Sequence, residues 1–332
     1  MSTPPTQPPQ ISKVPEPPSP TSAANESSAT QNVGTKDPEY ILLPRGKDLN
    51  EATALDLAKS RPVQWIVLAG PSDSGKTTFL TSIYELFQSG IVENYAFAGS
   101  STLPAFEERC YLSRRVSGNQ MPHTQRTPYK PEDPGYLHIR VRSVEELRPF
   151  RDILCTDISG EMFEHARDSI AECKKMLFLK RARHLLLFLD SAKAVRRDKR
   201  WEMVEDGQAL LRSCMDSEMI RPRCAVNVVW SRFDYFDSQD SAEEHVRFRT
   251  DVERQFGQIF KALPNLRFSE VASRPLRKPT LGIGYGVPLI VKQWADSPLE
   301  MKAFDLFPKS YSGTRESELF ATRHFANEEL SR

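Results

Sequence analysis

The chain has 332 residues, 39% of them hydrophobic, which is enough for one large domain with insertions or for two small domains. Its formal net charge of +1 excludes a global electrostatic field that would attract nucleic acid or a membrane surface. The longest apolar runs, such as LLLFL at 185–189, are too short for a membrane span, and the five cysteines form no CxxC pair. We therefore expect a cytoplasmic protein with reduced thiols, without a membrane span or a nucleic-acid partner.

Residues 1–36 form a tail that is rich in Pro, Ser and Thr. Eight of the chain's 25 prolines fall in the first 20 positions, and no aromatic residue precedes Tyr40. Such a segment cannot bury enough apolar surface to offset the conformational entropy that ordering would cost. We expect a disordered tether, followed by a lead-in segment at 37–61.

Residues 62–297 are predicted to form one α/β domain. Continuous apolar runs such as VQWIVLA (63–69) indicate strands that are covered on both faces. The predicted strands are 63–69, 136–142, 153–157, 185–190, 225–230 and 266–272. The first predicted helix ends at Gly90, and the others lie near 162–180, 201–219, 242–262 and 287–296. This order predicts a three-layer sandwich, in which helices cover both faces of a six-stranded, mostly parallel sheet.

The strand 136–142 differs from the others because its apolar and polar residues alternate. Leu137, Ile139 and Val141 would face the core, and the residues between them would face water. This pattern predicts an edge strand. The connection 143–152 is too short for a crossover helix, so we expect this strand to run antiparallel to the next one.

The strongest motif is GPSDSGKTT at 70–78, between the first strand and the first helix. It matches G-x-x-x-x-G-K-[ST], the phosphate loop (P-loop) of nucleoside triphosphatases. Glycines in such a loop let backbone N–H groups surround a phosphate at the positive end of a helix. We expect Lys76 to reach the β and γ oxygens and the Thr77 hydroxyl to bind Mg²⁺. The residues predicted to hold the phosphates are Gly70, Ser72, Asp73, Ser74, Gly75, Lys76, Thr77 and Thr78.

A second carboxylate usually faces the magnesium from the end of another strand, and two aspartates fit. Asp190 ends LLLFLD, as the acidic residue of many ATPases does, but Ser191 follows it where those enzymes carry Glu. Asp157 ends ILCTD and begins Asp-Ile-Ser-Gly, in which Gly160 could offer its N–H to a γ-phosphate. We favour Asp157 as the magnesium aspartate.

Two later loops are candidates for reading the base. Asp234, in Ser-Arg-Phe-Asp after the fifth strand, could accept two hydrogen bonds from guanine, which adenine cannot supply in that arrangement. Ser273, in a small-residue loop after the sixth strand, could help to present backbone N–H to guanine O6.

These motifs occur in the order of a Ras-like, TRAFAC-type GTPase domain, which the chain resembles over about 60–297. The phrases TTFLTSIYELFQSG, YAFAGSSTLPAFEERC and CTDISGEMFEHARDS are more narrowly similar to the bacterial double-GTPase family. The resemblance implies GTP or GDP with Mg²⁺ as ligands, with Lys76 and Thr77 at the phosphates, Asp157 and Gly160 in the second switch, and Asp234 at guanine. It also implies a second GTPase as partner, in a multi-gene system of conflict or defence.

Two positions depart from the usual pattern of the resemblance. Ser231 and Arg232 stand where Asn or Thr and Lys are usual, and Arg232 could still lay its stem along the loop. Glu161 follows DISG where a fast GTPase often has Gln. Because a carboxylate is repelled by a γ-phosphate, we expect slow unaided hydrolysis or a different catalytic group.

The connection 91–135 is long enough to be a functional insertion, the first switch of a GTPase. Its front part, TLPAFEERCYLSRR, is helix-like, and its rear part is rich in proline. Thr127 is our candidate for a magnesium ligand, with Thr124 as the next choice. Arg126 could act as a built-in arginine finger.

The leading hypothesis is a GTP-binding switch whose ordered surface is read by a partner protein. One alternative is a P-loop ATPase that uses Asp190 as the metal aspartate. Another is a scaffold that binds nucleotide without turnover. Residues 298–332 form a charged extension whose role the sequence does not reveal.

Overall fold

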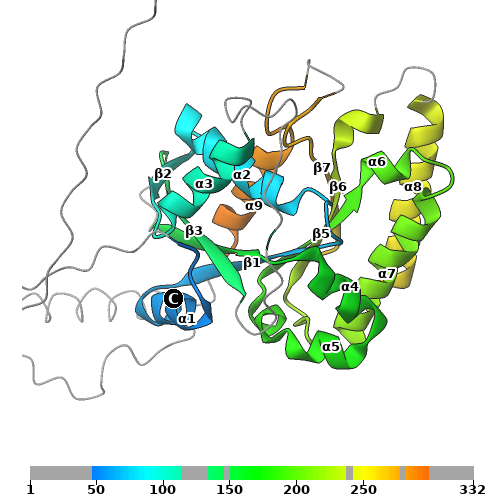
Figure 1. Cartoon of the computed structure of the whole chain (residues 1–332), viewed down its shortest axis with the longest axis horizontal. Helices are drawn as coiled ribbons and strands as arrows, with labels where there is room; N and C mark the ends of the chain where they lie inside the picture. The colour runs from blue at the N-terminus through cyan, green and yellow to red at the C-terminus, as the bar shows by residue number, and fades with distance from the viewer. Residues whose placement is uncertain are drawn as a thin grey trace, which may run out of the picture. The chain divides into compact units, whose positions relative to one another are not determined.

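The computed structural model describes residues 47–113, 127, 134–145, 150–236, 242–276 and 281–298. The tail predicted at 1–36 and nearly all of the extension predicted at 298–332 lie outside the described residues, as does most of the proline-rich part of the insertion. The described residues belong to one compact unit. That unit is a sheet with helices on both faces (Figure 1).

In the described part of the chain, seven strands form one sheet in the order β2-β3-β4-β1-β5-β6-β7. The pairs from β4 through β1, β5 and β6 to β7 are parallel, whereas β2–β3 and β3–β4 are antiparallel. The strands are β1 (Val63–Ala69), β2 (Tyr95–Gly99), β3 (Gly135–Ser143), β4 (Arg151–Asp157), β5 (His184–Asp190), β6 (Ala225–Ser231) and β7 (Arg267–Glu270). The predicted fold class is therefore confirmed, and so is the predicted antiparallel pairing of β3 with β4.

The strand count and the edge assignment need correction. Within the described ranges, the sheet has seven strands rather than six, and β2 rather than β3 occupies the edge. The missed strand, YAFAG at 95–99, is only five residues long, is mostly half-buried and has a register shift between Phe97 and Gly99. Its apolar run is only four residues long, ends at a glycine and contains two alanines, so it gives a weak strand signal. The residues between the apolar ones do not all face water as expected, because His138 is 3% exposed and Arg142 is the one residue of β3 in the exposed class.

Central strand β1 has an apolar residue at nearly every position because both of its faces are covered. Val67 and Ala69 join the core on one face, and Ile66 and Leu68 join the core on the other. We call these the α7-side core and the α2-side core. The α7-side core also takes residues from α1, α4, α5 and α8, whereas the α2-side core takes residues from α2, α3 and α9 (Figure 1).

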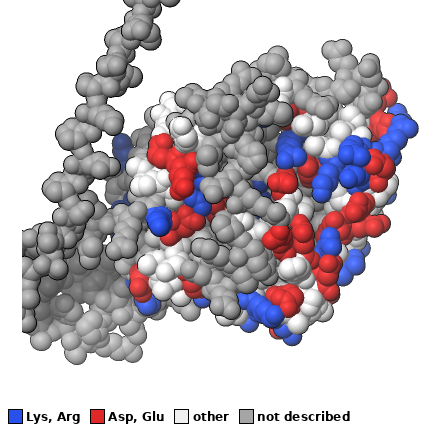
Figure 2. All heavy atoms as spheres, in the orientation of Figure 1, with Lys and Arg blue, Asp and Glu red and all other residues white. Residues whose placement is uncertain are grey.

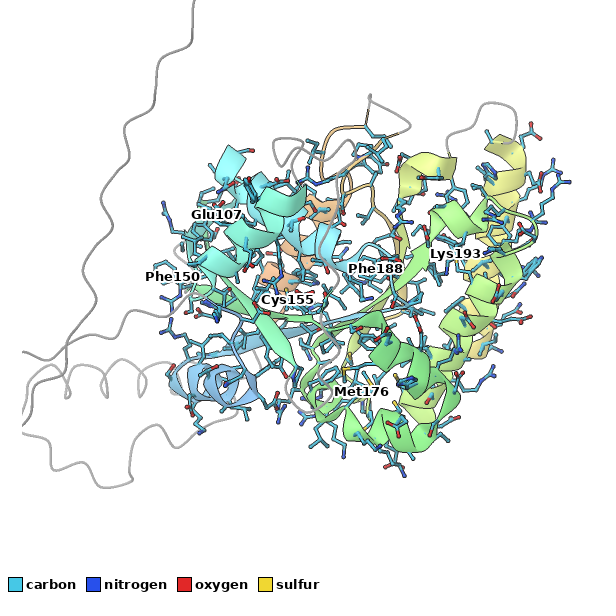
Figure 3. All side chains as sticks on the ribbon, in the orientation of Figure 1. Glu107, Phe150, Cys155, Met176, Phe188 and Lys193 are labelled. Atoms are coloured by element: carbon cyan, nitrogen blue, oxygen red, sulfur yellow. The ribbon has the colours of Figure 1, made fainter. Side chains whose placement is uncertain are left out.

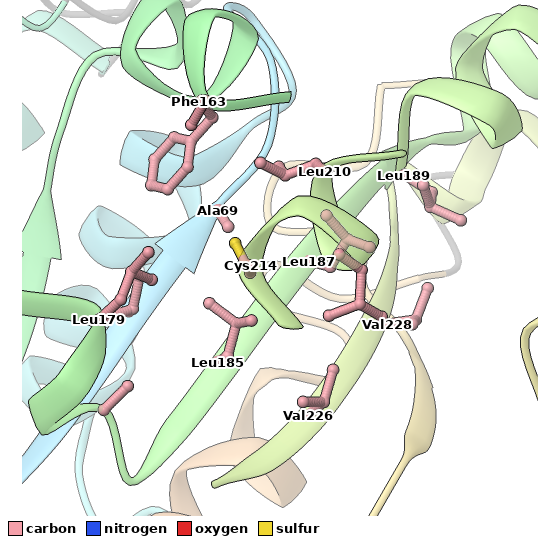
Figure 4. Packing of buried hydrophobic residues seen from close by; sticks show 14 of the residues in the cluster. Ala69, Phe163, Leu179, Leu185, Leu187, Leu189, Leu210, Cys214, Val226 and Val228 are labelled. Carbon is pink, nitrogen blue, oxygen red and sulfur yellow. The ribbon is translucent and has the colours of Figure 1, made fainter. Parts of the chain in front are cut away.

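The helices and 3₁₀ turns that form the two outer layers have these bounds: α1 (Glu51–Ser60), α2 (Lys76–Ser89), α3 (Leu103–Ser113), α4 (Gly160–Asp168), α5 (Ile170–Lys175), η2 (Leu177–Arg181), α6 (Ser191–Ala194), α7 (Arg200–Asp216), η3 (Phe233–Phe236), α8 (Ala242–Ile259) and α9 (Val287–Asp296). Figure 4 shows the α7-side core, where leucines of β5 and valines of β6 pack against Leu210 and Cys214 of α7. Figure 3 shows Cys155 of β4 and Phe188 of β5, which both lie in the α2-side core.

Two predicted segments differ from the observed helices. The single helix expected near 162–180 is divided into α4, α5 and η2, because Ser169 takes an extended conformation and caps α5 by accepting a hydrogen bond from Glu172 N. The lead-in segment at 37–61, for which no helix was predicted, contains α1. Asn50 caps that helix through a hydrogen bond from Thr53 N, 2.9 Å long.

The charge distribution on the surface and the state of the cysteines agree with the near-zero net charge and the reduced thiols expected from the composition. On the face shown in Figure 2, acidic and basic side chains are interspersed rather than gathered by sign. All five cysteines are buried free thiols. None of the helices in the described ranges has the length and apolar character needed to cross a bilayer.

Candidate nucleotide site

The phosphate loop connects the buried end of β1 to the start of α2. Gly70 has a φ of +145°, and a Cβ there would lie 3.2 Å from both Cβ and the carbonyl oxygen of Phe188. Gly75 caps α2 in the left-handed region, with a φ of +92°. Both positions therefore require glycine, one for close packing against β5 and one for its backbone conformation. The loop shape expected from the motif follows from these two residues.

Lys76 is the buried cation of the loop. Its Nζ donates to the carbonyl oxygens of Gly70 and Pro71, each at 2.8 Å. Burial lowers the pKa of Lys76 to about 8, and the negative charges of Asp157, Glu164 and Asp73 oppose that effect. The ammonium group therefore lies among carboxylates at the place where the motif calls for phosphate.

Three side-chain oxygens from distant parts of the chain meet beside the loop. Thr77 Oγ1 lies 3.3 Å from Thr127 Oγ1 and donates to Asp157 Oδ1 at 3.2 Å. Thr127 Oγ1 also donates to Asp157 Oδ1, at 3.2 Å. Two hydroxyls and a carboxylate are hard oxygen donors of the kind that Mg²⁺ prefers, so this trio fits a magnesium ion. These are the three residues that the sequence analysis selected as metal ligands.

Arg109 of α3 is a site residue that the sequence analysis missed. Its Nε donates to Asp157 Oδ2 at 2.7 Å, and its Nη2 donates to Asp48 Oδ2 at 2.6 Å. Asp157 therefore uses one carboxylate oxygen for the two threonines and the other for Arg109. No sequence signal marks Arg109, because it is one of many arginines and the contact depends on how the insertion folds back.

The start of α4 lies directly against the phosphate loop. A Cβ on Gly160 would lie 2.1 Å from Ser72 N and 2.3 Å from the carbonyl carbon of Pro71, so only glycine fits. One helical turn later, Glu164 Oε1 accepts a hydrogen bond from Ser72 N at 3.0 Å. Gly160 was predicted from the sequence, but Glu164 was not. The i, i+4 spacing to Gly160 is the signal that could have identified it.

Asp190 does not belong to the trio of oxygens, because both of its carboxylate oxygens bind other groups. Its Oδ1 caps α6 by accepting from Ala192 N, and its Oδ2 accepts from Arg232 Nη1 at 3.1 Å. Burial raises the pKa of Asp190, and the Arg232 guanidinium opposes this. Arg232 Nη2 also donates to the carbonyl oxygen of Asp73 at 2.5 Å. Arg232 thus ties the loop after β6 to the phosphate loop.

The two candidate base-reading loops lie side by side. Phe233 N donates to Val271 O at 3.0 Å, which joins the loop after β6 to the end of β7. Asp234 is 4% exposed, and its Oδ2 accepts from Leu276 N at 3.0 Å, three residues beyond Ser273. The carboxylate is thus held at the loop where the guanine edge was expected.

Most of the predicted phosphate and metal residues line one cavity. The cavity is lined by Ser72, Asp73, Ser74, Gly75, Lys76, Thr77, Thr78, Thr127, Ile158, Ser159, Gly160 and Arg232. Gly70, Asp157, Asp234 and Ser273 are not among its lining residues. Glu161 lies half-buried in the first turn of α4. Arg126 and Thr124 lie outside the described residues.

A phosphate loop after β1, an Asp-x-x-Gly segment after β4 and an aspartate after β6, on a mostly parallel sheet, are the arrangement of a P-loop GTPase. The model of the Double-GTPase 2 family matches residues 64–295. The chain belongs to this family, and the recognition of a double-GTPase is confirmed.

Two solved structures are similar at low identity. One is the signal recognition particle receptor SRb-GTP/SRX complex from Chaetomium thermophilum, with 13% identity and a TM-score of 0.36 over 71% of this chain and 97% of that chain. The other is translation elongation factor SelB from Methanococcus maripaludis in complex with the GTP analogue GppNHp. It has 13% identity and a TM-score of 0.37 over 72% of this chain and 35% of that chain. A search of curated proteins gave no match.

Proposed function

We propose that this chain is a GTP-binding molecular switch that hydrolyses GTP slowly when alone. The observation that supports this most directly is the meeting of Thr77, Thr127 and Asp157 within 3.3 Å of one another. They come from the phosphate loop, the long insertion and the end of β4. A switch needs such a junction, because the nucleotide must act on two segments at once.

The proposed roles follow from the positions of these side chains. Lys76 and the backbone of 70–78 hold the phosphates, and Thr77, Thr127 and Asp157 hold Mg²⁺, which would offset phosphate charge. Gly160 offers its N–H to the γ-phosphate. Asp234 and the loop at Ser273 read guanine, and Arg232 braces the loop after β6 against Asp73.

Slow hydrolysis is inferred from Glu161. A carboxylate at this place would be repelled by the γ-phosphate and would orient an attacking water poorly at neutral pH. Arg126 remains our candidate for a built-in arginine finger. A partner could instead supply the missing catalytic group, as activating proteins do for other GTPases.

The partner we propose is a second GTPase or another effector that reads the surface formed by the insertion and α4. The family name supports a second GTPase. We further propose that the pair acts in the bacterial cytoplasm, as part of a multi-gene system of conflict or defence.

Titration of fluorescent GTP, GDP and ATP, with and without Mg²⁺, tests the proposal. We expect both guanine nucleotides to bind far more tightly than ATP. Lys76→Ala should abolish binding, and Asp234→Ala should weaken GTP binding about 100-fold, because two hydrogen bonds to a charged group are lost. Asp251→Ala, on the exposed side of α8, is the matched control and should bind like the wild type.

The competing hypotheses predict other outcomes. Equal or tighter binding of ATP would support the ATPase alternative, against which the Asp190–Arg232 ion pair already argues. Partner binding that survives Lys76→Ala would favour the scaffold. Absence of any purine nucleotide binding by folded protein would overturn the proposal altogether.

A further inference from the structure

We propose that Glu164 of α4 is a specificity-determining residue that lowers the affinity of this chain for GTP relative to GDP. This inference rests on the proposed function, because it assumes that the phosphate loop binds both nucleotides. It concerns a residue outside the motifs of the sequence analysis. It follows from the way in which α4 docks on the phosphate loop.

The face of α4 that meets the loop contains Gly160 and Glu164, one helical turn apart. The helix is fixed in place, because Met162, Phe163 and Ala166 are buried in the α7-side core. Ser213 of α7 adds a hydrogen bond of 2.6 Å to the carbonyl oxygen of Ala166. The helix therefore presents Gly160 and Glu164 to the loop as one rigid surface.

The contact between this surface and the loop is close. The Gly160 backbone packs against the peptide of Pro71 and Ser72, where even a Cβ would not fit. Glu164 Oε1 accepts from Ser72 N at 3.0 Å. Backbone N–H groups of a phosphate loop normally point toward phosphate. In this chain, Glu164 accepts a hydrogen bond from the N–H of Ser72, a loop residue that lines the cavity.

Glu164 lies near the residues that are expected to bind the γ-phosphate. Gly160 is the residue expected to offer its N–H to a γ-phosphate, and Glu164 is bonded to the amide that Gly160 touches. Lys76 Nζ donates to the carbonyl oxygen of Pro71, and the N–H of the same peptide unit, Ser72 N, donates to Glu164. Glu164 is therefore close to the cation that would bind the β- and γ-phosphates.

GTP and GDP differ at this location by one phosphoryl group and its negative charge. A carboxylate near the γ-phosphate repels GTP more than GDP, and the partly desolvated setting strengthens that repulsion. The hydrogen bond from Ser72 N holds the carboxylate at this place. Glu164 thereby favours the GDP-bound form of the switch, because GTP binding has to overcome the repulsion between its γ-phosphate and the carboxylate.

The test measures dissociation constants for GDP and for the slowly hydrolysed analogue GTPγS with Mg²⁺, in the full chain and two variants. Glu164→Gln keeps an oxygen acceptor for Ser72 N and removes the charge, whereas Glu164→Ala removes both. Both variants should raise the ratio of the GDP constant to the GTPγS constant about tenfold, with the GDP constant nearly unchanged. Glu172→Gln on α5, whose carboxylate pairs with Lys175, is the matched control and should leave the ratio unchanged.

The outcomes distinguish a failure of this inference from a failure of the proposed function. A ratio within twofold of the wild type in both Glu164 variants overturns the role of Glu164 while leaving guanine binding intact. A rise in Glu164→Ala alone overturns the charge argument, because Glu164→Gln lacks the charge as well. Failure of the wild type to bind GDP or GTPγS overturns both the proposed function and this inference.

Discussion

Gly160 shows how a single residue sets the position of a whole segment at this site. It starts α4, and its missing side chain lets the helix touch the backbone of the phosphate loop. The sequence analysis chose Gly160 for its N–H and its flexibility. The structure adds a steric reason, because a Cβ would lie 2.1 Å from Ser72 N.

Gly160→Ala should therefore prevent α4 from docking on the loop. We expect the affinity for GTPγS to fall at least about tenfold, because the γ-phosphate loses the Gly160 amide, with a smaller change for GDP. The two dissociation constants with Mg²⁺ provide the measurement. Equal affinities for GTPγS in Gly160→Ala and the wild type would contradict the steric argument.

Gly257 offers a matched control for this substitution. It lies within α8, and a Cβ there would meet nothing within 4 Å. Gly257→Ala should leave nucleotide binding unchanged and should stabilise the fold by about 0.5–1 kcal/mol, because alanine loses less backbone entropy in a helix.

At the scale of elements, α3 connects Asp157, at the end of β4, to the segment that precedes α1. Arg109 bridges Asp157 of β4 and Asp48, and Leu49 pairs with Tyr136 of β3 through two backbone hydrogen bonds of 2.9 Å. The ion pair with Asp157 is largely buried, since the two side chains are 16% and 2% exposed. A buried carboxylate that loses its cation is costly.

Arg109→Met should lower the free energy of unfolding by about 3 kcal/mol in the absence of nucleotide, because Asp157 would be left without its cationic partner. Urea unfolding measures this change. Arg254→Met removes an exposed ion pair with Asp251 on α8 and should cost less than about 1 kcal/mol. Similar costs for the two variants would mean that Arg109 contributes little to holding Asp157.

The elements also show which parts of the structure can be predicted from sequence and which cannot. Strands β1, β4, β5 and β6 were found because buried parallel strands leave continuous apolar runs. The phosphate loop was found because its chemistry fixes residue types at fixed spacing. Arg109 was missed because its contact with Asp157 joins residues 48 positions apart and leaves no local pattern. The contact of Glu164 with Ser72 spans 92 positions, and its only local trace is the i, i+4 spacing to Gly160.

For the whole molecule, stability should depend on pH through a group far from the phosphate loop. His184 begins β5, at the end of the strand opposite to Asp190, and is 7% exposed. Its Nε2 lies 3.0 Å from Ser297 Oγ, just beyond α9. Burial, together with the charges of Arg183 and Arg267, lowers the pKa of His184 to about 4, from an ordinary value of 6.5.

The sign of the effect follows from the two pKa values. Between pH 6.5 and pH 4, the unfolded chain binds a proton at His184 that the folded chain does not bind, so acid favours unfolding. The stabilisation is complete above pH 6.5 and is lost as the pH falls toward 4. From pH 7 to pH 5, this one group should lower the free energy of unfolding by about 2 kcal/mol.

Urea unfolding of the wild type and His184→Gln at pH 7 and pH 5 tests this expectation. The variant should lose about 2 kcal/mol less stability than the wild type over this interval, whatever its stability at pH 7, because its side chain does not titrate. His245→Gln is the control, since that imidazole lies 3.0 Å from the carbonyl oxygen of Phe236 on another part of the surface, and it should keep the wild-type dependence. If His184→Gln also kept it, the buried imidazole would not be the group that couples folding of this sheet to pH.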